Sequence, residues 1–265
     1  MSPRNVVVLA FDGVQILDVT GPLEVFDEAC RFTSGPRPYR VHCLGVDPAP
    51  VRASNGLRLA VDRCTASRRR IDTLVVPGGL EESLERLRGD DRFMAWLARS
   101  AGSARRAGSV CTGAFLLAAA GLLDDRRATT HWAAVQRLRR AVPKARIEPD
   151  ALHTRDGPIH TSAGVTAGID LALALVEEDL GRAVATAIAR NLVLYLRRPG
   201  YQSQFSAPLR AQARERVIDG ARALGFEHRA WCTSPIRGRE GNEEFLVWLV
   251  WPAHGDDAAE LPSRP

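Results

Sequence analysis

Cys111 stands in the stretch of the chain with the clearest chemical potential, residues 109–113, which read Ser-Val-Cys-Thr-Gly. The residues before the cysteine suit a short strand and those after it suit a helix, so we expect a strand–turn–helix with the thiol at the turn. Ser109 and Gly113, two positions before and two after the cysteine, leave the space that a tight nucleophile elbow requires. This spacing indicates a nucleophilic cysteine.

The surroundings expected for this thiol favour its charged form. Cys111 would face the amino end of the helix 113–120, where unpaired N–H groups create a partial positive charge. We therefore expect the pKa of Cys111 to lie below the free-thiol value of about 8.5. The alternative is a structural role, because free cysteine is among the most buried residue types and most often only fills space.

A second strand end is expected beside the cysteine. Residues 72–77 form a run that predicts a buried strand, and Gly78 and Gly79 follow it directly. In parallel α/β sheets, binding sites lie at the carboxyl ends of the strands. Gly78, Gly79 and Cys111 are therefore expected to meet at one site.

The elements that must position these residues alternate regularly between strand-like and helix-like segments. Strands are expected at residues 6–10, 39–45, 57–61, 72–77, just before Cys111, and at 152–155 and 159–162. Helices are expected at residues 17–31, 91–106, 113–120, 131–140 and, in two segments broken near Gly181, 165–194. This alternation predicts an α/β fold whose mainly parallel sheet is covered by helices on both faces.

Composition narrows the class of protein. The chain is 45% hydrophobic and 25% charged, which is ordinary for a soluble globular protein. No segment approaches the ~18 consecutive apolar residues of a membrane span, and no cleavable signal peptide fits the amino terminus. The five cysteines are widely spaced and form no C-x-x-C pair, which argues against disulfides and a zinc site. We expect a cytoplasmic protein with no metal, no cofactor and no membrane contact.

The net charge of +5 does not by itself indicate a nucleic-acid partner. Lys144 is the only lysine among the 36 basic residues, a bias typical of a GC-rich genome rather than of selection for phosphate contacts. From residue 201 onward, 8 basic and 9 acidic residues leave a net charge of −1. A carboxy-terminal DNA-binding module would normally be basic, so we expect no direct DNA binding by this chain.

Six motifs carry a resemblance to a known family. They lie in order between residue 5 and about residue 206, at 17–26, 75–79, 109–113, 127–132, 161–170 and 197–205. Together they resemble the ThiJ/PfpI superfamily, within the flavodoxin-like, class I glutamine-amidotransferase-like fold. The nearest resemblance is to the amino-terminal domain of GlxA-type AraC-family regulators, and isonitrile hydratases share most of the motifs.

This resemblance implies a particular site around the nucleophile. Asp18 stands where relatives carry an acidic residue that hydrogen-bonds the thiolate, which would stabilise the charged sulfur and keep the carboxyl protonated. On this view, replacing Asp18 with Ala slows alkylation of Cys111. The alternative for Asp18 is a local role at the start of its helix.

The resemblance also implies a pocket of backbone amides. The amides of Gly79 and Thr112, with Gly78 and Gly113 beside them, would form an oxyanion-type pocket near the sulfur. His131 stands at the spacing where some relatives place a histidine near the cysteine, and its alternative is a core histidine with satisfied hydrogen bonds. Peptidase-like members carry histidine directly after the cysteine, where this chain has Thr112, so we expect no protease activity.

The carboxy-terminal part departs from the family pattern. We divide the chain into a ThiJ/PfpI-like domain, 1–206, and an appendage, 207–265. GlxA-type regulators continue into two helix-turn-helix units of about a hundred residues, whereas the appendage is shorter and predicts a helix at 209–224, a turn at 234–238 and a strand at 245–251. Residues 234–249 resemble the end of TlyA-like RNA methyltransferases, without any catalytic part. The appendage therefore contains no complete helix-turn-helix.

Two functions follow from these observations. The first is the ligand-sensing domain of a GlxA-type transcriptional regulator that lacks its DNA-binding half, binding a small molecule as a homodimer. The second is a cysteine-dependent hydro-lyase resembling isonitrile hydratase, in which Cys111 attacks a small electrophile, Asp18 handles protons and water releases a formamide. Redox sensing through oxidation of Cys111 is compatible with both.

Overall fold

A computed structural model describes residues 2–47, 49–63, 70–194, 198, 200–201, 204, 207–237 and 243–251. The chain divides into two compact units, Met1–Gln204 and Phe205–Pro265. The first unit is an α/β domain that contains all the predicted site residues.

Seven strands of the first unit form one sheet. Their order is β10 (His153–Asp156), β11 (Ile159–Ser162), β7 (Arg106–Val110), β6 (Thr73–Val76), β1 (Arg4–Ala10), β2 (Tyr39–Gly45) and β5 (Asp62–Arg63). All neighbours pair in parallel except β10 and β11. Two small ribbons accompany the sheet, β3 (Val51–Arg52) with β4 (Arg58–Leu59) and β8 (Arg127–Ala128) with β9 (Arg146–Ile147).

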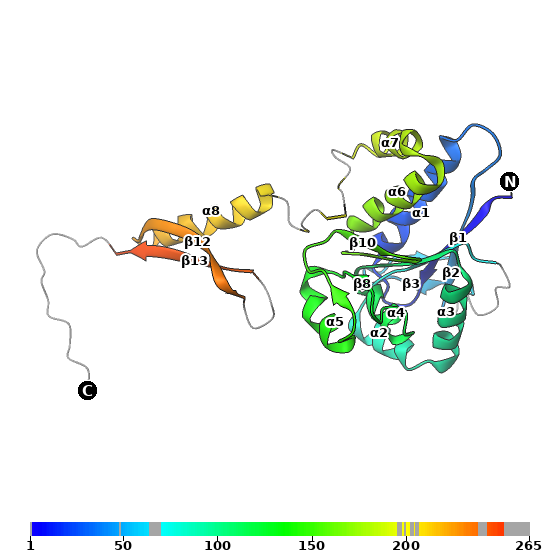
Figure 1. Ribbon diagram of the computed structural model, residues 1–265, viewed down its shortest axis with the longest axis horizontal. Coiled ribbons are helices and arrows are strands. Elements are labelled where there is room, and N and C mark those ends of the chain that lie inside the picture. The colour runs from blue at the N-terminus through cyan, green and yellow to red at the C-terminus, as the bar shows by residue number, and fades with distance from the viewer. Residues whose placement is uncertain are drawn as a thin grey trace, which may run out of the picture. The chain divides into compact units, whose positions relative to one another are not determined.

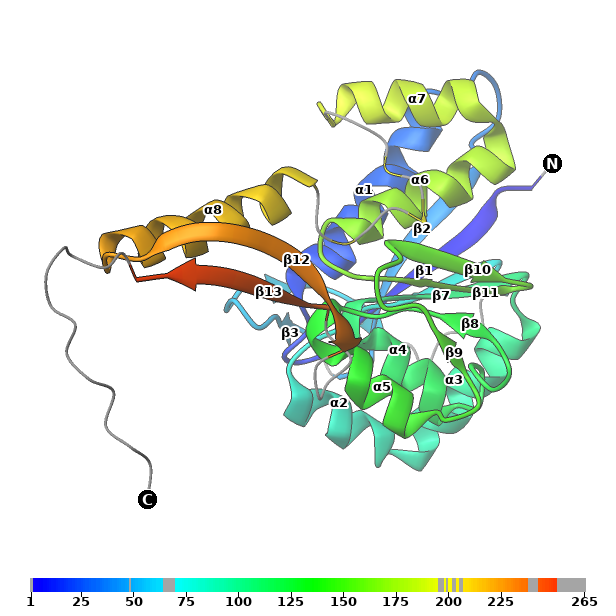
Figure 2. The same cartoon turned by 60° about the vertical axis from the view of Figure 1, so that its left-hand side comes forward.

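Helices cover both faces of this sheet (Figures 1 and 2). One face carries α1 (Ile16–Arg31), α6 (Ala167–Leu180) and α7 (Arg182–Asn191), and the other carries α2 (Glu81–Arg88), α3 (Asp91–Ser103), α4 (Ala114–Ala119) and α5 (Val135–Ala141). The central strands β1, β6 and β7 are buried because both faces are covered, and this burial explains their continuous apolar runs. The α/β fold expected from the sequence is confirmed.

Three local expectations were wrong. The helix expected at 91–106 ends at Ser103, because Arg106 begins β7. The strand expected at 57–61 is reduced to the two residues of β4. Helix α2 was not expected, although Leu84 and Leu87 form the buried side of an otherwise charged helix directly after Gly79.

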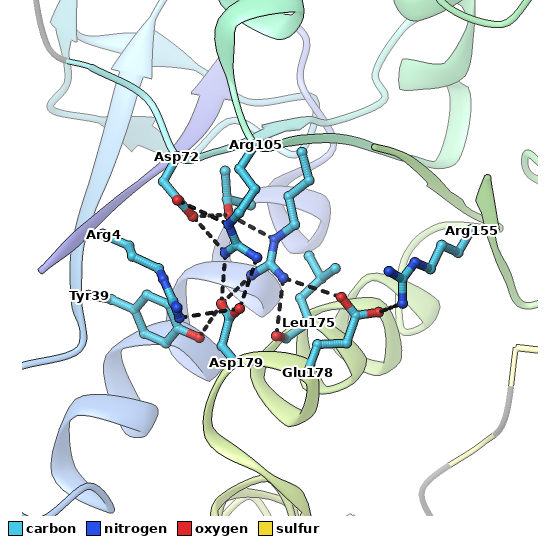
Figure 3. A network of polar contacts seen from close by, with 10 residues as sticks. Arg4, Tyr39, Asp72, Arg105, Arg155, Leu175, Glu178 and Asp179 are labelled. Atoms are coloured by element: carbon cyan, nitrogen blue, oxygen red, sulfur yellow. Dashed lines mark hydrogen bonds and ion pairs between the residues drawn. The ribbon is translucent and has the colours of Figure 1, made fainter. Parts of the chain in front are cut away.

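A network of charged side chains lies at the amino ends of the strands (Figure 3). The Arg106 guanidinium lies 2.7 Å from Oδ2 of Asp179, and both side chains are only 3% exposed. Arg4 and Arg105 reach the other carboxylate oxygen of Asp179, and the Tyr39 hydroxyl donates to Oδ2 at 2.8 Å. The buried Arg106 and Asp179 charges are thus paired at the amino edge of the sheet, whereas Cys111 lies at the opposite, carboxyl edge.

The second unit contains one helix and one hairpin. Helix α8 (Ala207–Ala223) is followed by the antiparallel strands β12 (Glu227–Arg237) and β13 (Glu243–Val250). The turn expected at 234–238 was wrong, because 234–237 belong to β12; residue 238 lies outside the described residues. The pairing register shifts between Thr233 and Arg237, which accommodates Pro235 within a strand.

Candidate active site

Cys111 occupies a strained turn between a strand and a helix. It follows β7 directly and begins the single 3₁₀ turn Cys111–Gly113, after which α4 starts at Ala114. Its φ angle is 57°, in the left-handed region that non-glycine residues rarely adopt. The strand–turn–helix geometry expected around this cysteine is confirmed, and the half-buried thiol stands at its apex.

Glycines make this turn possible, as Gly78 and Gly113 illustrate. A Cβ on Gly113 would lie 2.8 Å from the Pro77 carbonyl oxygen, and a Cβ on Gly78 would lie 2.9 Å from Cβ of Cys111. The loop after β6 therefore packs directly against the elbow.

Gly164 is a site residue that sequence reasoning did not single out. A Cβ there would lie 2.6 Å from Cα and 2.8 Å from Sγ of Cys111, and its φ of +102° is itself a glycine conformation. The signal was present, because Gly164 belongs to one of the six motifs, at 161–170.

Asp18 joins three separate loops beneath the sulfur. Its carboxylate is fully buried in α1 and accepts the Gly78 amide at 3.0 Å and the Val165 amide at 2.8 Å. It also shares a side-chain hydrogen bond with Cys111. All these partners lie outside α1, whose amino-terminal cap residue is Gln15. Asp18 therefore serves the site and not the start of its own helix.

The pKa values of Asp18 and Cys111 correct one expectation. Burial raises the pKa of Asp18 to about 6, although its two backbone N–H donors oppose the rise. Burial, and then the charge of Asp18, raise the pKa of Cys111 to about 12. A thiol pKa below 8.5 was therefore wrong, because desolvation and a neighbouring carboxylate outweigh the hydrogen bonds from Thr112. The thiol is therefore the hydrogen-bond donor and the ionised Asp18 carboxylate the acceptor, the reverse of the direction that the resemblance implies.

Thr112 supplies hydrogen-bond donors beside the sulfur. Hydrogen bonds from the Thr112 backbone and side chain lower the pKa of Cys111, and the Thr112 hydroxyl also donates to the Gly79 carbonyl at 3.4 Å. The Gly79 amide donates to the Thr112 hydroxyl oxygen at 3.2 Å. The pocket implied for Gly79 and Thr112 thus brings the Thr112 amide to the sulfur, while the Gly79 amide reaches it only through the threonine side chain. Negative charge developing beside the sulfur would meet these donors.

His131 has a local hydrogen-bonding role. Its Nδ1 accepts the Ala133 amide at 3.3 Å and caps the 3₁₀ turn Trp132–Ala134. Burial lowers the pKa of His131, so the ring is neutral at pH 7. The preceding residue, Thr130, contacts Cys111 directly, because its hydroxyl donates to the Cys111 carbonyl at 2.8 Å. This geometry favours the structural reading of His131.

Within the described part of the chain, no group of three or more His, Cys, Asp or Glu side chains is arranged to hold a metal ion. None of the described helices is long and apolar enough to cross a membrane.

Comparison with known proteins identifies the family that this fold and site define. The chain belongs to the DJ-1/PfpI family, whose model matches residues 4–178. It is 39% identical over 176 residues to the isonitrile hydratase of Pseudomonas putida, covering 65% of this chain and 71% of that enzyme. It is 34% identical over 197 residues to the HTH-type transcriptional regulator CdhR of Pseudomonas aeruginosa, covering 74% of this chain but 56% of the regulator.

Solved structures agree with this assignment. The crystal structure of a ThiJ/PfpI family protein from Pseudomonas syringae superposes with a TM-score of 0.66 at 25% identity, covering 84% of this chain and 88% of that one. The resemblance of the carboxy-terminal part also finds a counterpart, because 54 residues there are 39% identical to the putative rRNA methyltransferase YqxC of Bacillus subtilis. That match covers 20% of this chain and 19% of YqxC.

Proposed function

We propose that the first unit is a ligand-sensing domain of the GlxA type and that residues 1–265 do not themselves bind DNA. The observation that carries the proposal is the position of Asp18, which joins the sulfur, the loop after β6 and the loop before α6. A small molecule that binds at Cys111 would disturb this carboxylate and, through it, two loops from different parts of the chain. Such an arrangement converts a local binding event into a wider change.

The described elements of the second unit are not those of a helix-turn-helix pair. They are one helix and an antiparallel hairpin, α8, β12 and β13. The match to the regulator CdhR spans 56% of that protein's length. We further propose that the protein acts as a cytoplasmic homodimer.

The first test of this proposal asks whether the chain binds DNA. The full-length protein is mixed with a randomised duplex pool at physiological salt, and retained DNA is amplified and sequenced over several rounds. We expect no enriched sequence. Enrichment of one sequence, followed by submicromolar binding to it in a gel-shift titration, would contradict the proposal.

A second candidate function, isonitrile hydration, is favoured by the hydrogen bond between Asp18 and Cys111. The terminal carbon of an isonitrile must receive both the sulfur and a proton, so a protonated thiol beside a carboxylate of pKa about 6 suits this addition. The thiol proton would pass to Asp18 as the S–C bond forms, and then to the same carbon, giving a thioimidate. Water would add to that carbon, the C–S bond would break and sulfur would regain its proton. The products are an N-substituted formamide and the free thiol.

One experiment separates the two candidates. The protein is incubated with excess n-butyl isonitrile, the formamide is measured by NMR, and the protein mass is measured in parallel. Many formamides per protein, abolished by Cys111→Ala, would support the enzyme. A single adduct on Cys111 without turnover would support the sensor. No formamide and no adduct would exclude isonitriles for both.

A further inference from the structure

The residues that lead out of α7 towards the second unit return to the candidate site. Among the described ones, Gly200 accepts the His153 amide at 3.3 Å through its carbonyl oxygen, and the Gln204 amide donates to the Asp150 carbonyl at 2.9 Å. We call Arg198, Gly200, Tyr201 and Gln204 the connector. The connector belongs to the first unit, where it lies alongside Asp150 and His153 at the start of β10.

One end of the connector holds the loop that binds Asp18. Arg198 donates through Nε to Oδ2 of Asp170 at 3.0 Å and through Nη2 to the Thr166 hydroxyl at 3.0 Å. The Arg198 amide donates to the other oxygen of Asp170 at 3.2 Å, and the Asp170 side chain is only 6% exposed. Thr166 directly follows Val165, whose amide binds Asp18. Arg198 therefore fixes the segment that presents this amide.

The other end holds the loop that binds the cysteine backbone. The Gln204 side-chain amide donates to the Thr130 carbonyl at 3.0 Å and to the Pro149 carbonyl at 2.9 Å. The Thr130 hydroxyl in turn donates to the Cys111 carbonyl at 2.8 Å. Gln204 is thus one residue removed from the strained peptide of the nucleophile.

We propose that Arg198 and Gln204 are positioning residues. From one connector they fix two parts of the site relative to each other, the loop whose Val165 amide binds Asp18 and the turn at Cys111. Neither side chain touches the sulfur: Arg198 acts on Asp18 through Thr166 and Val165, and Gln204 acts on Cys111 through Thr130. Because the connector continues into the second unit, a displacement at the site would move the segment that leads there. The inference rests on the proposed function only in taking Cys111 as the group that meets the ligand.

The test measures the pH profile of Cys111 alkylation in the full-length chain, by iodoacetamide labelling and peptide mass spectrometry. In Arg198→Ala the Val165 amide is held less well, and since that amide lowers the pKa of Asp18, we expect the inflection near pH 6 to move upward. Gln204→Glu keeps the size of the side chain but replaces its N–H donors, and we expect the labelling rate of Cys111 to change about threefold or more at every pH. Arg190→Ala, on the exposed side of α7, is the matched control and should leave both the pH inflection and the labelling rate of Cys111 unchanged.

A structural role alone predicts a different outcome. If Arg198→Ala and Gln204→Glu lower the melting temperature but keep the wild-type pH profile and rate, the proposal is overturned. If Arg198→Ala does not fold, Thr166→Val removes one acceptor of Arg198 while Asp170 keeps its partner, and the same shift is expected. These rates are compared with the wild type without any ligand, so failure of ligand sensing would appear separately, as a missing response of the wild type.

Discussion

The amide of Val165 lies 2.8 Å from Oδ1 of Asp18, although 147 residues separate the two in sequence. Val165 adopts a φ of 50°, which is unusual for a β-branched residue. Cys111, across the same carboxylate, is also in the left-handed region. Backbone strain of this kind costs about 1–3 kcal/mol at each residue and persists where the surrounding contacts enforce it. Two strained residues thus meet at one buried acid.

Replacing Gly164 tests how closely this strained loop packs on the nucleophile. Gly164→Ala adds a Cβ that would overlap Cys111, and it also forces a side chain into φ +102°. Gly181→Ala has the same backbone difficulty at φ +86° but nothing within 4 Å, so it is the matched control. We expect Gly181→Ala to cost about 1–3 kcal/mol, and Gly164→Ala to cost more and to change the labelling rate of Cys111. Urea unfolding measures the loss of stability in each variant, and alkylation kinetics measure the reactivity of Cys111. An equal loss of stability in both variants, with an unchanged alkylation rate, would contradict the close packing of Gly164 on Cys111.

The titration of Asp18 predicts how stability depends on pH. Its pKa is raised from 3.8 to about 6 by folding, so the folded state holds this proton more tightly than the unfolded state. The contribution is therefore fully present below pH 3.8 and is lost as pH rises through 6, by about 2–3 kcal/mol. Asp18→Asn cannot titrate, so the wild type should lose that much relative to this variant between pH 4 and pH 7. Urea unfolding measures both proteins at both pH values. The same difference in unfolding free energy at pH 4 and pH 7 would contradict the raised pKa of Asp18.

The charged network at the amino ends of the strands should affect stability without affecting the site. Asp179→Ala leaves the buried Arg106 guanidinium without its closest partner, and removing one member of a buried pair costs about 3–5 kcal/mol. The Cys111 labelling rate should remain that of the wild type, because the network lies at the other edge of the sheet. Chemical denaturation and peptide mass spectrometry on the same variant provide both readings. A slower or faster Cys111 would mean that the two edges are coupled.

Local patterns explain what the sequence predicted well. The strand 39–45 was expected with the bounds that β2 has, and the elbow was readable from the small residues around Cys111. Helix α2 was missed although its apolar spacing was visible. The hairpin of the second unit was half missed, because Pro235 reads as a turn residue and only the paired strand β13 shows that it lies at an irregularity in β12.

Long-range contacts explain what the sequence did not predict. The junction at Asp18 joins residues 60 and 147 positions away, which depends on the order of the strands and not on any local pattern. The pKa of Cys111 illustrates the consequence. The favourable helix end can be read from neighbouring residues, but burial and the Asp18 charge, the two largest influences on the pKa of Cys111, arise only when distant segments meet.

The most direct test of this account compares alkylation with isonitrile chemistry in Asp18→Asn. Removing the carboxylate charge should lower the pKa of Cys111 from about 12, so iodoacetamide should label Cys111 faster than in the wild type at pH 8. The same change removes the proton acceptor, so formation of the thioimidate or formamide should fall. Faster alkylation together with weaker isonitrile chemistry is the predicted result. Slower alkylation in Asp18→Asn would contradict the raised pKa of Cys111, and undiminished isonitrile chemistry would contradict Asp18 as the proton acceptor.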